Sequence, residues 1–387
     1  VENEPDSILL FEVQVDSNGT LFEKEWGGWS KNFEKNIPFI DSLQFIKYSD
    51  IVNVLWQEDL KTSMSTSLLV DGDKIFASTI DGKIHCFNLK GKLIWKYETN
   101  ETIFSKPVRD NDVLATATIE GDLFTINANN GELIQVIGIG EPLTSQLIKF
   151  NIQYRDVKTT AVVVGSSNGN LFCYDLYSLE QIWENNSASL MIETEPLLIN
   201  NKIIFGSWDN YLYCIDAGSG SLIWKWTENK NFYYSPAACW PVADEKNVYV
   251  STPDKYVSAV DLLLGTTVWR KNDFSSWESI GISNDKKDLL IKSFMDKFFI
   301  VSAKDGKQIK EVELKFGLDT MPVEPTEWNG KILFGAKDGN IYMINKDYSW
   351  EPIIFTGTAR AHSVQHIKDN IFAASNMDGK IFVFTIN

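Results

Sequence analysis

The 387-residue chain has few of the residues that build catalytic centres and no segment that would cross a membrane as a helix. It contains only three His and four Cys, no two Cys are adjacent, and no run of about 18 apolar residues occurs. The first residues, from Val1 to Pro5, lack a basic n-region and an apolar h-region, so we expect no signal peptide within this chain. No Gly-x-Ser-x-Gly elbow is present either, so a Ser-His-Asp hydrolase site cannot be recognised.

Positive charge is also scarce. The sequence has 36 Lys and Arg against 52 Asp and Glu, which gives a formal net charge of −16. Such a chain repels phosphate backbones, so we expect no nucleic-acid partner. An acidic surface is otherwise an ordinary means of staying soluble.

The chain is rich in residues that build a β-type core. Hydrophobic residues make up 44% and aromatic residues 13% of the sequence, enough for a large core without disulfides. Cys86, Cys173 and Cys214 occupy one repeated strand position, and equivalent atoms of separate repeats lie too far apart for a disulfide. We therefore expect these residues, and Cys239, to be small buried hydrophobes.

A repeated unit organises most of the sequence. A short turn followed by an apolar strand recurs at intervals from 39 residues, between positions 82 and 121, to 48 residues, between positions 121 and 169. A β-type period in the low forties is typical of propeller blades. The repeated turn positions are Gly82, Gly121, Gly169, Asn210, Lys255, Lys297, Gly339 and Gly379.

The second half of each unit carries a recognisable motif. Residues 259–269 read Ala-Val-Asp-Leu-Leu-Leu-Gly-Thr-Thr-Val-Trp, which resembles the Ala-x-Asp-x-x-x-Gly-x-x-x-Trp docking repeat of the quinoprotein-like (PQQ-repeat) β-propellers. Some copies depart from it: Leu179 stands where Gly belongs, and Gln135 and Lys310 stand where Trp belongs. The resemblance implies a structural role for the tryptophans at the motif position, which cover the neighbouring blade. They are Trp56, Trp95, Trp183, Trp224 and Trp269.

The resemblance, with the count of repeats, predicts an all-β, eight-bladed propeller of four-stranded antiparallel blades over residues 51–387. The last repeat ends after its third strand. The segment 52–58, with Trp56, copies an outer strand, so it should complete the C-terminal blade and close the ring. The connection 149–158 lengthens the hairpin of the third blade and is an alternative partner contact.

Residues 1–50 do not fit the repeat. Apolar stretches at 8–13 and 20–26 flank a turn at 16–19 and predict one hairpin, followed by a polar connector. This hairpin resembles the end of the calcineurin-like metallophosphoesterase domain that precedes such propellers in some bacterial fusion proteins. The resemblance implies a fused upstream domain. None of the metal-binding motifs of that domain is present, so no phosphatase activity is assigned to this chain.

Redox and metal chemistry find little support in the sequence. The quinone-dependent alcohol dehydrogenases share the repeat. Those enzymes also resemble one another in having a pair of adjacent cysteines and long insertions, and this chain lacks both. We therefore expect no cofactor. His362 and His366 are four residues apart on one predicted strand face, but no third ligand is evident, so we expect no metal site.

The surface loops are what remains for function. Aromatic residues and Arg on loops of one propeller face favour partner binding, although they could simply cover the blade tops. The candidate binding face comprises Trp208, Phe232, Tyr233, Tyr234, Trp277, Arg360 and His362. The starts of the inner strands add polar groups that could line the channel: Lys106, Gln146, Glu195, Glu324 and Gln365.

The first hypothesis is a non-catalytic scaffold that binds a protein or peptide, in a periplasmic or secreted bacterial protein. It would resemble, in fold and in lacking a cofactor, the scaffold lipoproteins of the outer-membrane barrel-assembly machinery. The alternatives are an accessory domain of a metallophosphoesterase fusion and, third, a quinone-dependent dehydrogenase.

Overall fold

The structure is a computed structural model that describes residues 13–15, 21–25, 28–30, 49–228 and 231–387. The chain divides into two compact units, residues 1–47 and residues 48–387. Within the described residues, no helix is long and apolar enough to cross a membrane.

The described part of the first unit is a three-stranded antiparallel sheet. Strand β1 (Val13–Val15) pairs with β2 (Leu21–Glu25), and β2 pairs with β3 (Gly28–Ser30). The predicted hairpin pairing is therefore present, with Val15 opposite Leu21. Strand β3 is an addition that the sequence analysis does not predict, and the predicted strand residues 8–12 lie outside the described residues.

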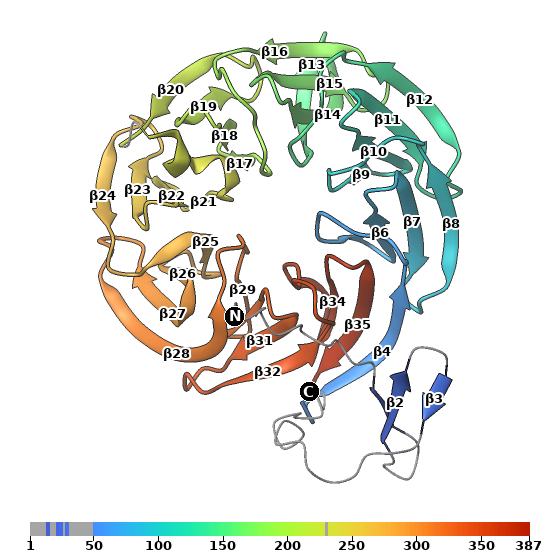
Figure 1. The fold of residues 1–387 in the computed structure, drawn as a ribbon. Coiled ribbons are helices and arrows are strands. Elements are labelled where there is room, and N and C mark those ends of the chain that lie inside the picture. The colour runs from blue at the N-terminus through green and yellow to red at the C-terminus, as the bar shows by residue number, and fades with distance from the viewer. Residues whose placement is uncertain (1–12, 16–20, 26–27, 31–48, 229–230) are drawn as a thin grey trace, which may run out of the picture. The chain divides into compact units, whose positions relative to one another are not determined.

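The described residues of the second unit form eight four-stranded antiparallel sheets around a central axis, which confirms the predicted propeller (Figure 1). The first four blades have these strands: blade 1, β5 (Leu69–Asp71), β6 (Lys74–Ser78), β7 (Lys83–Asn88) and β8 (Leu93–Glu98); blade 2, β9 (Val108–Asp110), β10 (Val113–Ala117), β11 (Asp122–Asn127) and β12 (Leu133–Gly138); blade 3, β13 (Ile148–Tyr154), β14 (Val157–Gly165), β15 (Leu171–Asp175) and β16 (Gln181–Asn185); blade 4, β17 (Leu197–Ile199), β18 (Lys202–Gly206), β19 (Leu212–Asp216) and β20 (Leu222–Trp226).

The other four blades follow the same order, with two short 3-10 helices, η2 (Phe232–Tyr234) and η3 (Pro236–Ala238), between blades 4 and 5. Their strands are: blade 5, β21 (Val242–Ala243), β22 (Asn247–Ser251), β23 (Val257–Asp261) and β24 (Thr267–Lys271); blade 6, β25 (Ser276–Ile282), β26 (Asp288–Ser293), β27 (Met295–Ser302) and β28 (Gln308–Leu318); blade 7, β29 (Thr326–Trp328), β30 (Lys331–Gly335), β31 (Asn340–Ile344) and β32 (Trp350–Phe355); blade 8, β33 (Gln365–Lys368), β34 (Ile371–Ser375), β35 (Lys380–Ile386) and β4 (Val52–Asp59).

Burial follows the position of a strand within its blade. The second and third strands are apolar on both faces, as in β6, where all five residues are buried, because each blade is covered by a neighbour on either side. The outer strand alternates with solvent, as in β8, where Trp95 is buried between exposed Ile94 and Lys96. The core therefore lies between the blades, in clusters shared by neighbours.

The ring closes as predicted. Strand β4 pairs with β35, with Trp56 opposite Val383 and Val52 opposite Ile386. Next to this seam, the backbone N–H of Asn387 donates to the carbonyl of Ile51 at 2.8 Å. Figure 1 shows β4 beside β35, so the two ends of the ring are held by one sheet.

One of the eight predicted turns is wrong. Seven of the predicted turn residues have positive φ, including the non-glycines Asn210 at 80° and Lys255 at 68°. Lys297 instead lies inside β27, and its ammonium pairs with Glu311 of β28 at 2.5 Å. The left-handed conformation falls one residue earlier, on Asp296 at φ 49°, because the β26–β27 hairpin is shorter than its counterparts.

Five neighbouring pairs of blades share the same docking contact. The indole N–H of a tryptophan in one outer strand donates to a backbone carbonyl of the next blade. The turn glycine of that next blade packs against the indole ring. A Cβ on these glycines would lie between 2.5 and 2.8 Å from the indole. The bonds join Trp56 to Leu89 (2.9 Å), Trp95 to Ala128 (3.1 Å), Trp183 to Ala217 (3.0 Å), Trp224 to Leu262 (3.1 Å) and Trp269 to Ala303 (3.0 Å).

The four cysteines are unpaired and buried. Burial raises the pKa of the Cys86 and Cys239 thiols to about 12, so neither is a nucleophile near neutral pH. The blade 3 hairpin is long, as its sequence predicts, with β13 and β14 paired out to Tyr154 and Val157.

Candidate functional site

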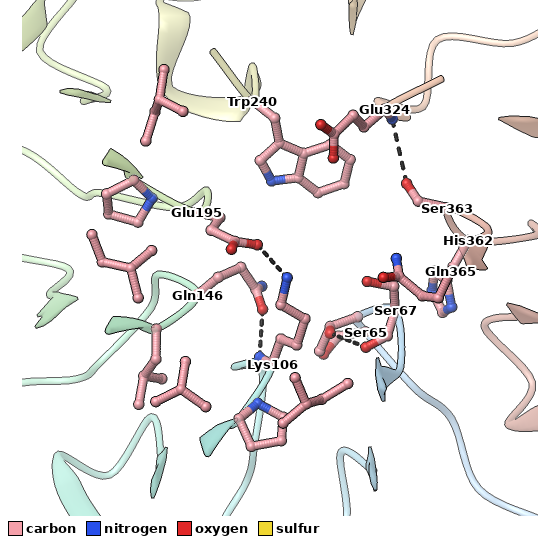
Figure 2. Close-up of a pocket in the computed structure, with 18 of the residues that line it drawn as sticks. Ser65, Ser67, Lys106, Gln146, Glu195, Trp240, Glu324, His362, Ser363 and Gln365 are labelled. Carbon is pink, nitrogen blue, oxygen red and sulfur yellow. Dashed lines mark hydrogen bonds and ion pairs between the residues drawn. The ribbon is translucent and has the colours of Figure 1, made fainter. Parts of the chain in front are cut away.

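A cavity of about 440 Å³ lies at the centre of the ring. Described residues of every blade except the sixth contribute to its wall, mostly from the segments that enter the inner strands. All five residues predicted to line the channel do so: Lys106, Gln146, Glu195, Glu324 and Gln365 (Figure 2).

A repeated local sequence places several of these side chains. Lys106, Glu195, Trp240 and Glu324 each stand two residues before an inner strand and directly before a proline. Proline restricts the residue before it to extended backbone, so these four equivalent positions have the same conformational preference. The sequence analysis missed Trp240, which the recurring X-Pro signal could have found.

The cavity contains one paired and one unpaired carboxylate. The Lys106 ammonium contacts Glu195 at 2.5 Å, and the backbone N–H of Lys106 donates to the side-chain oxygen of Gln146. The Glu324 side chain is exposed to the cavity, and partial desolvation by the surrounding ring, with the nearby Glu195 charge, raises its pKa above the usual range. Among the described residues, its carboxylate has no hydrogen-bond or ion-pair partner.

His362 lies in the cavity wall and is only 3% exposed. Its Nδ1 lies 3.0 Å from the Ser375 hydroxyl, and its Nε2 has no hydrogen-bond partner in the described part of the chain. Burial, and then the Arg360 charge, lower its pKa to about 3, so the ring is neutral at physiological pH.

The structure does not bring His362 and His366 together. His366 Nε2 lies 2.9 Å from the carbonyl of Asp369, and its ring packs on Trp328 and Phe372. No group of three His, Cys, Asp or Glu that could hold a metal ion occurs among the residues that the structure describes.

Four residues of the candidate binding face, Trp208, Phe232, Tyr233 and Tyr234, lie on the β18–β19 turn of blade 4 and on the connection between blades 4 and 5, and a fifth, Trp277, lies in β25 of blade 6. Tyr233 is 67% exposed and Tyr234 is 37% exposed, both on η2. The hydroxyl of Ser235, which follows them, donates to the carbonyl of Ser207, which precedes Trp208, so η2 lies against the Trp208 turn. Phe232 is the first residue of η2.

Two carboxylates, the half-buried Glu193 and the buried Glu278, lie between Trp208 and Trp277. The Trp208 indole N–H donates to Glu193 at 2.8 Å. Glu278 is buried, and this burial, with the Glu193 charge, raises its pKa to about 8 against a smaller opposing hydrogen bond from Trp277. The sequence analysis missed both carboxylates, and no sequence signal marks them, because they meet only when blades 4 and 6 curve around blade 5.

Arg360 lies apart from these aromatic residues, between blades 7 and 8. Its guanidinium donates to the carbonyl of Pro322, and burial lowers its pKa against the opposing attraction of Asp319. Asp319 in turn pairs with Lys292 at 3.1 Å, and both side chains are 1% exposed. We call the connected set Trp208, Tyr233, Tyr234 and Trp277 the aromatic face, which excludes Arg360 and His362.

This arrangement defines a closed β-propeller that presents an exposed aromatic surface and a central cavity lined by both polar and apolar side chains. The family model described as outer membrane protein assembly factor BamB matches residues 53–189 and 167–382, so the chain belongs to that family. The fold and the family resemblance predicted from the repeat are thus confirmed. The match begins at residue 53, and a fused metallophosphoesterase stays a prediction.

Individual relatives are distant. The outer membrane protein assembly factor BamB of Burkholderia pseudomallei is 24% identical over 57% of this chain, and the match spans 58% of that protein. The Escherichia coli protein of the same name is 19% identical over 75% of this chain and 74% of its own length. BamB of Moraxella catarrhalis superposes with a TM-score of 0.70 at 16% identity, covering 86% of this chain and 99% of that one, which shows the fold.

Proposed function

We propose that this chain is a non-catalytic, extracytoplasmic scaffold of a bacterium, which binds a protein partner during the assembly of outer-membrane proteins. The observation that carries the proposal is the aromatic face, which exposes two tyrosines. The family supports it, because its described members are outer-membrane assembly factors. A rigid ring with exposed loops offers a surface for a protein partner.

The chemistry of the aromatic face suits a protein partner. Tyrosine and tryptophan supply large contact area at low entropic cost and dominate binding hot spots. Tyr233 is 67% exposed, whereas Trp208 is half-buried and anchored by Glu193. The hydrogen bond to Glu193 holds the Trp208 indole in one orientation near the exposed tyrosines.

The test is site-specific photo-crosslinking in the native host. A photoreactive phenylalanine analogue at Tyr233 should crosslink to a component of the outer-membrane assembly apparatus. The same analogue at Leu263, which is 70% exposed on an outer turn, is the matched control and should not. Identical crosslinks at the two positions, or crosslinks from Tyr233 to cytosolic proteins alone, would contradict the proposal.

The energetic contribution is measured with the partner thus identified. Replacing Tyr233 and Tyr234 together by Ala should weaken binding by about tenfold to a thousandfold, as expected for hot-spot residues that cost about 2–4 kcal/mol. The matched double variant Leu263→Ala/Leu264→Ala removes two exposed apolar side chains elsewhere and should leave the affinity unchanged.

A further inference from the structure

The unpaired carboxylate of Glu324 is the most unusual group in the central cavity. The charged groups that act on it are Glu195 and Lys106, and these two pair with each other. A carboxylate that faces a cavity without a counter-ion of its own, beside the negative charge of Glu195, attracts a cation that enters the cavity. The aromatic face proposed above to bind protein lies on different residues.

The surroundings of Glu324 supply further groups that suit a cation. Figure 2 shows the Trp240 indole next to the Glu324 carboxylate, with His362 and Gln365 on the same side of the cavity. The face of an indole attracts a cation. The neutral His362 residue is 3% exposed, and its Nε2 has no hydrogen-bond partner in the described part of the chain, so it accepts a hydrogen bond when Nδ1 carries the proton.

The opposite wall already shows how the cavity accommodates an ammonium group. The Lys106 ammonium is held there by Glu195. Glu324 repeats the Glu195 position three blades further round the ring, but no lysine of the described residues pairs with it. The net charge of −16 also draws small cations toward the molecule.

We propose that the central cavity binds a primary alkylammonium group, with Glu324 as its counter-ion, the Trp240 indole against its charge, and His362 as a hydrogen-bond acceptor. The three N–H donors of an ammonium match these partners in kind. The group comes from a free alkylamine or from a lysine side chain of a peptide inserted into the ring.

Isothermal titration of the whole chain with pentane-1,5-diamine and with a short capped peptide containing one central lysine tests the site. Wild-type protein should bind at least one of them. Glu324→Gln, which keeps the shape and removes the charge, should weaken binding about tenfold or more, as expected for a hydrogen bond to a charged group. If the peptide binds more tightly than the diamine, the source is a lysine side chain; the reverse order indicates a free amine.

The control is Glu132→Gln, an equal charge change at an exposed residue outside the cavity, which should leave both affinities unchanged. Equal weakening by both variants, or no binding of either probe to wild type, would overturn the proposal. A second measurement needs no variant: the indole N–H resonance of Trp240 should move on titration of the wild type, and not with the acetylated peptide. An unmoved resonance at saturation would also refute the site.

Discussion

The interface between blades 2 and 3 tests whether the docking contact between blades is a true unit of two residues. Here Gln135 replaces the tryptophan, and Leu179 replaces the glycine that would face it. Leu179 nevertheless keeps the turn of the glycine-containing copies: φ is 53°, and its N–H donates to the carbonyl of Asp175 at 2.9 Å. With no indole opposite, a side chain fits at this position and is 6% exposed.

If the two positions act as a unit, the effects of Leu179→Gly and Gln135→Trp on the free energy of unfolding should be strongly coupled. Leu179→Gly alone should cost about 1–3 kcal/mol, because the loss of a buried leucine, about 2–5 kcal/mol, is partly offset by about 1–2 kcal/mol of relieved left-handed strain. Gln135→Trp alone should cost about 1–3 kcal/mol, because the indole would overlap Leu179. Together they recreate the pair found in five other interfaces, so the coupling should be favourable by about 2–3 kcal/mol.

The assay is equilibrium unfolding in urea of the wild type, both single variants and the double variant. The midpoints and slopes give the coupling free energy directly. Gln135→Trp combined with Leu198→Gly, in blade 4, is the matched control and should be additive. If the Gln135→Trp/Leu179→Gly pair is also additive within about 0.5 kcal/mol, the two positions do not form a unit and the reasoning is refuted.

Three further substitutions test other features of the ring. Gly265→Ala should destabilise the protein by about 2–4 kcal/mol in urea unfolding, because φ is 67° and a Cβ would lie 2.5 Å from Trp224, whereas Gly140→Ala, with φ 84° and nothing within 4 Å, should cost only about 1–2 kcal/mol; equal costs would contradict the steric argument. The pKa of Glu278 is raised from 4.5 to about 8 in the fold, so the native state holds the carboxyl proton more tightly than the unfolded state does. The stability that this proton contributes is therefore lost as the pH rises from about 4.5 to 8. Glu278→Gln should remove that fall in melting temperature, and an unchanged profile would refute it. Lys292→Met strands a buried carboxylate and should cost about 3–5 kcal/mol in the same urea assay, while a loss below about 1 kcal/mol would show that the pair is not needed.

Much of the architecture is predictable because its signals are local. A turn that requires positive φ selects Gly or Asn, and an outer strand that alternates with solvent shows one buried tryptophan among exposed residues. Both signals recur with the blade, so their phase also locates the closing strand at Val52–Asp59. The prediction for Lys297 is wrong because its blade has a shorter hairpin, so that Lys297 lies in the strand opposite Glu313 and forms an ion pair with Glu311.

The position of a site residue is predictable from the sequence only where its place within one repeat determines where the side chain lies. The cavity residues Lys106 and Glu195 follow from their equivalent positions in the blades. Whether a loop residue is exposed depends on its neighbours from other blades, so His362 reads as a surface residue but is 3% exposed. The approach of Glu193 to Glu278, 85 positions apart (278 minus 193), depends on the curvature of the ring, which no local pattern encodes.

The docking contact is missing at three of the eight interfaces of the described ring, between blades 2 and 3, 6 and 7, and 7 and 8. The tryptophan–glycine contact links blades 3, 4, 5 and 6 without a break, and one buried cluster spans blades 4 to 6, the blades whose strands and connections carry the aromatic face. The contact is missing between blades 6 and 7 and between 7 and 8, where Glu324 and His362 lie. A surface held by continuous docking loses little entropy on binding, so the protein partner is expected at blades 4 to 6. Buried charge concentrates instead around blades 6 to 8, in the Lys292–Asp319 pair and Arg360, and there the ring depends on polar contacts that a bound cation would complete.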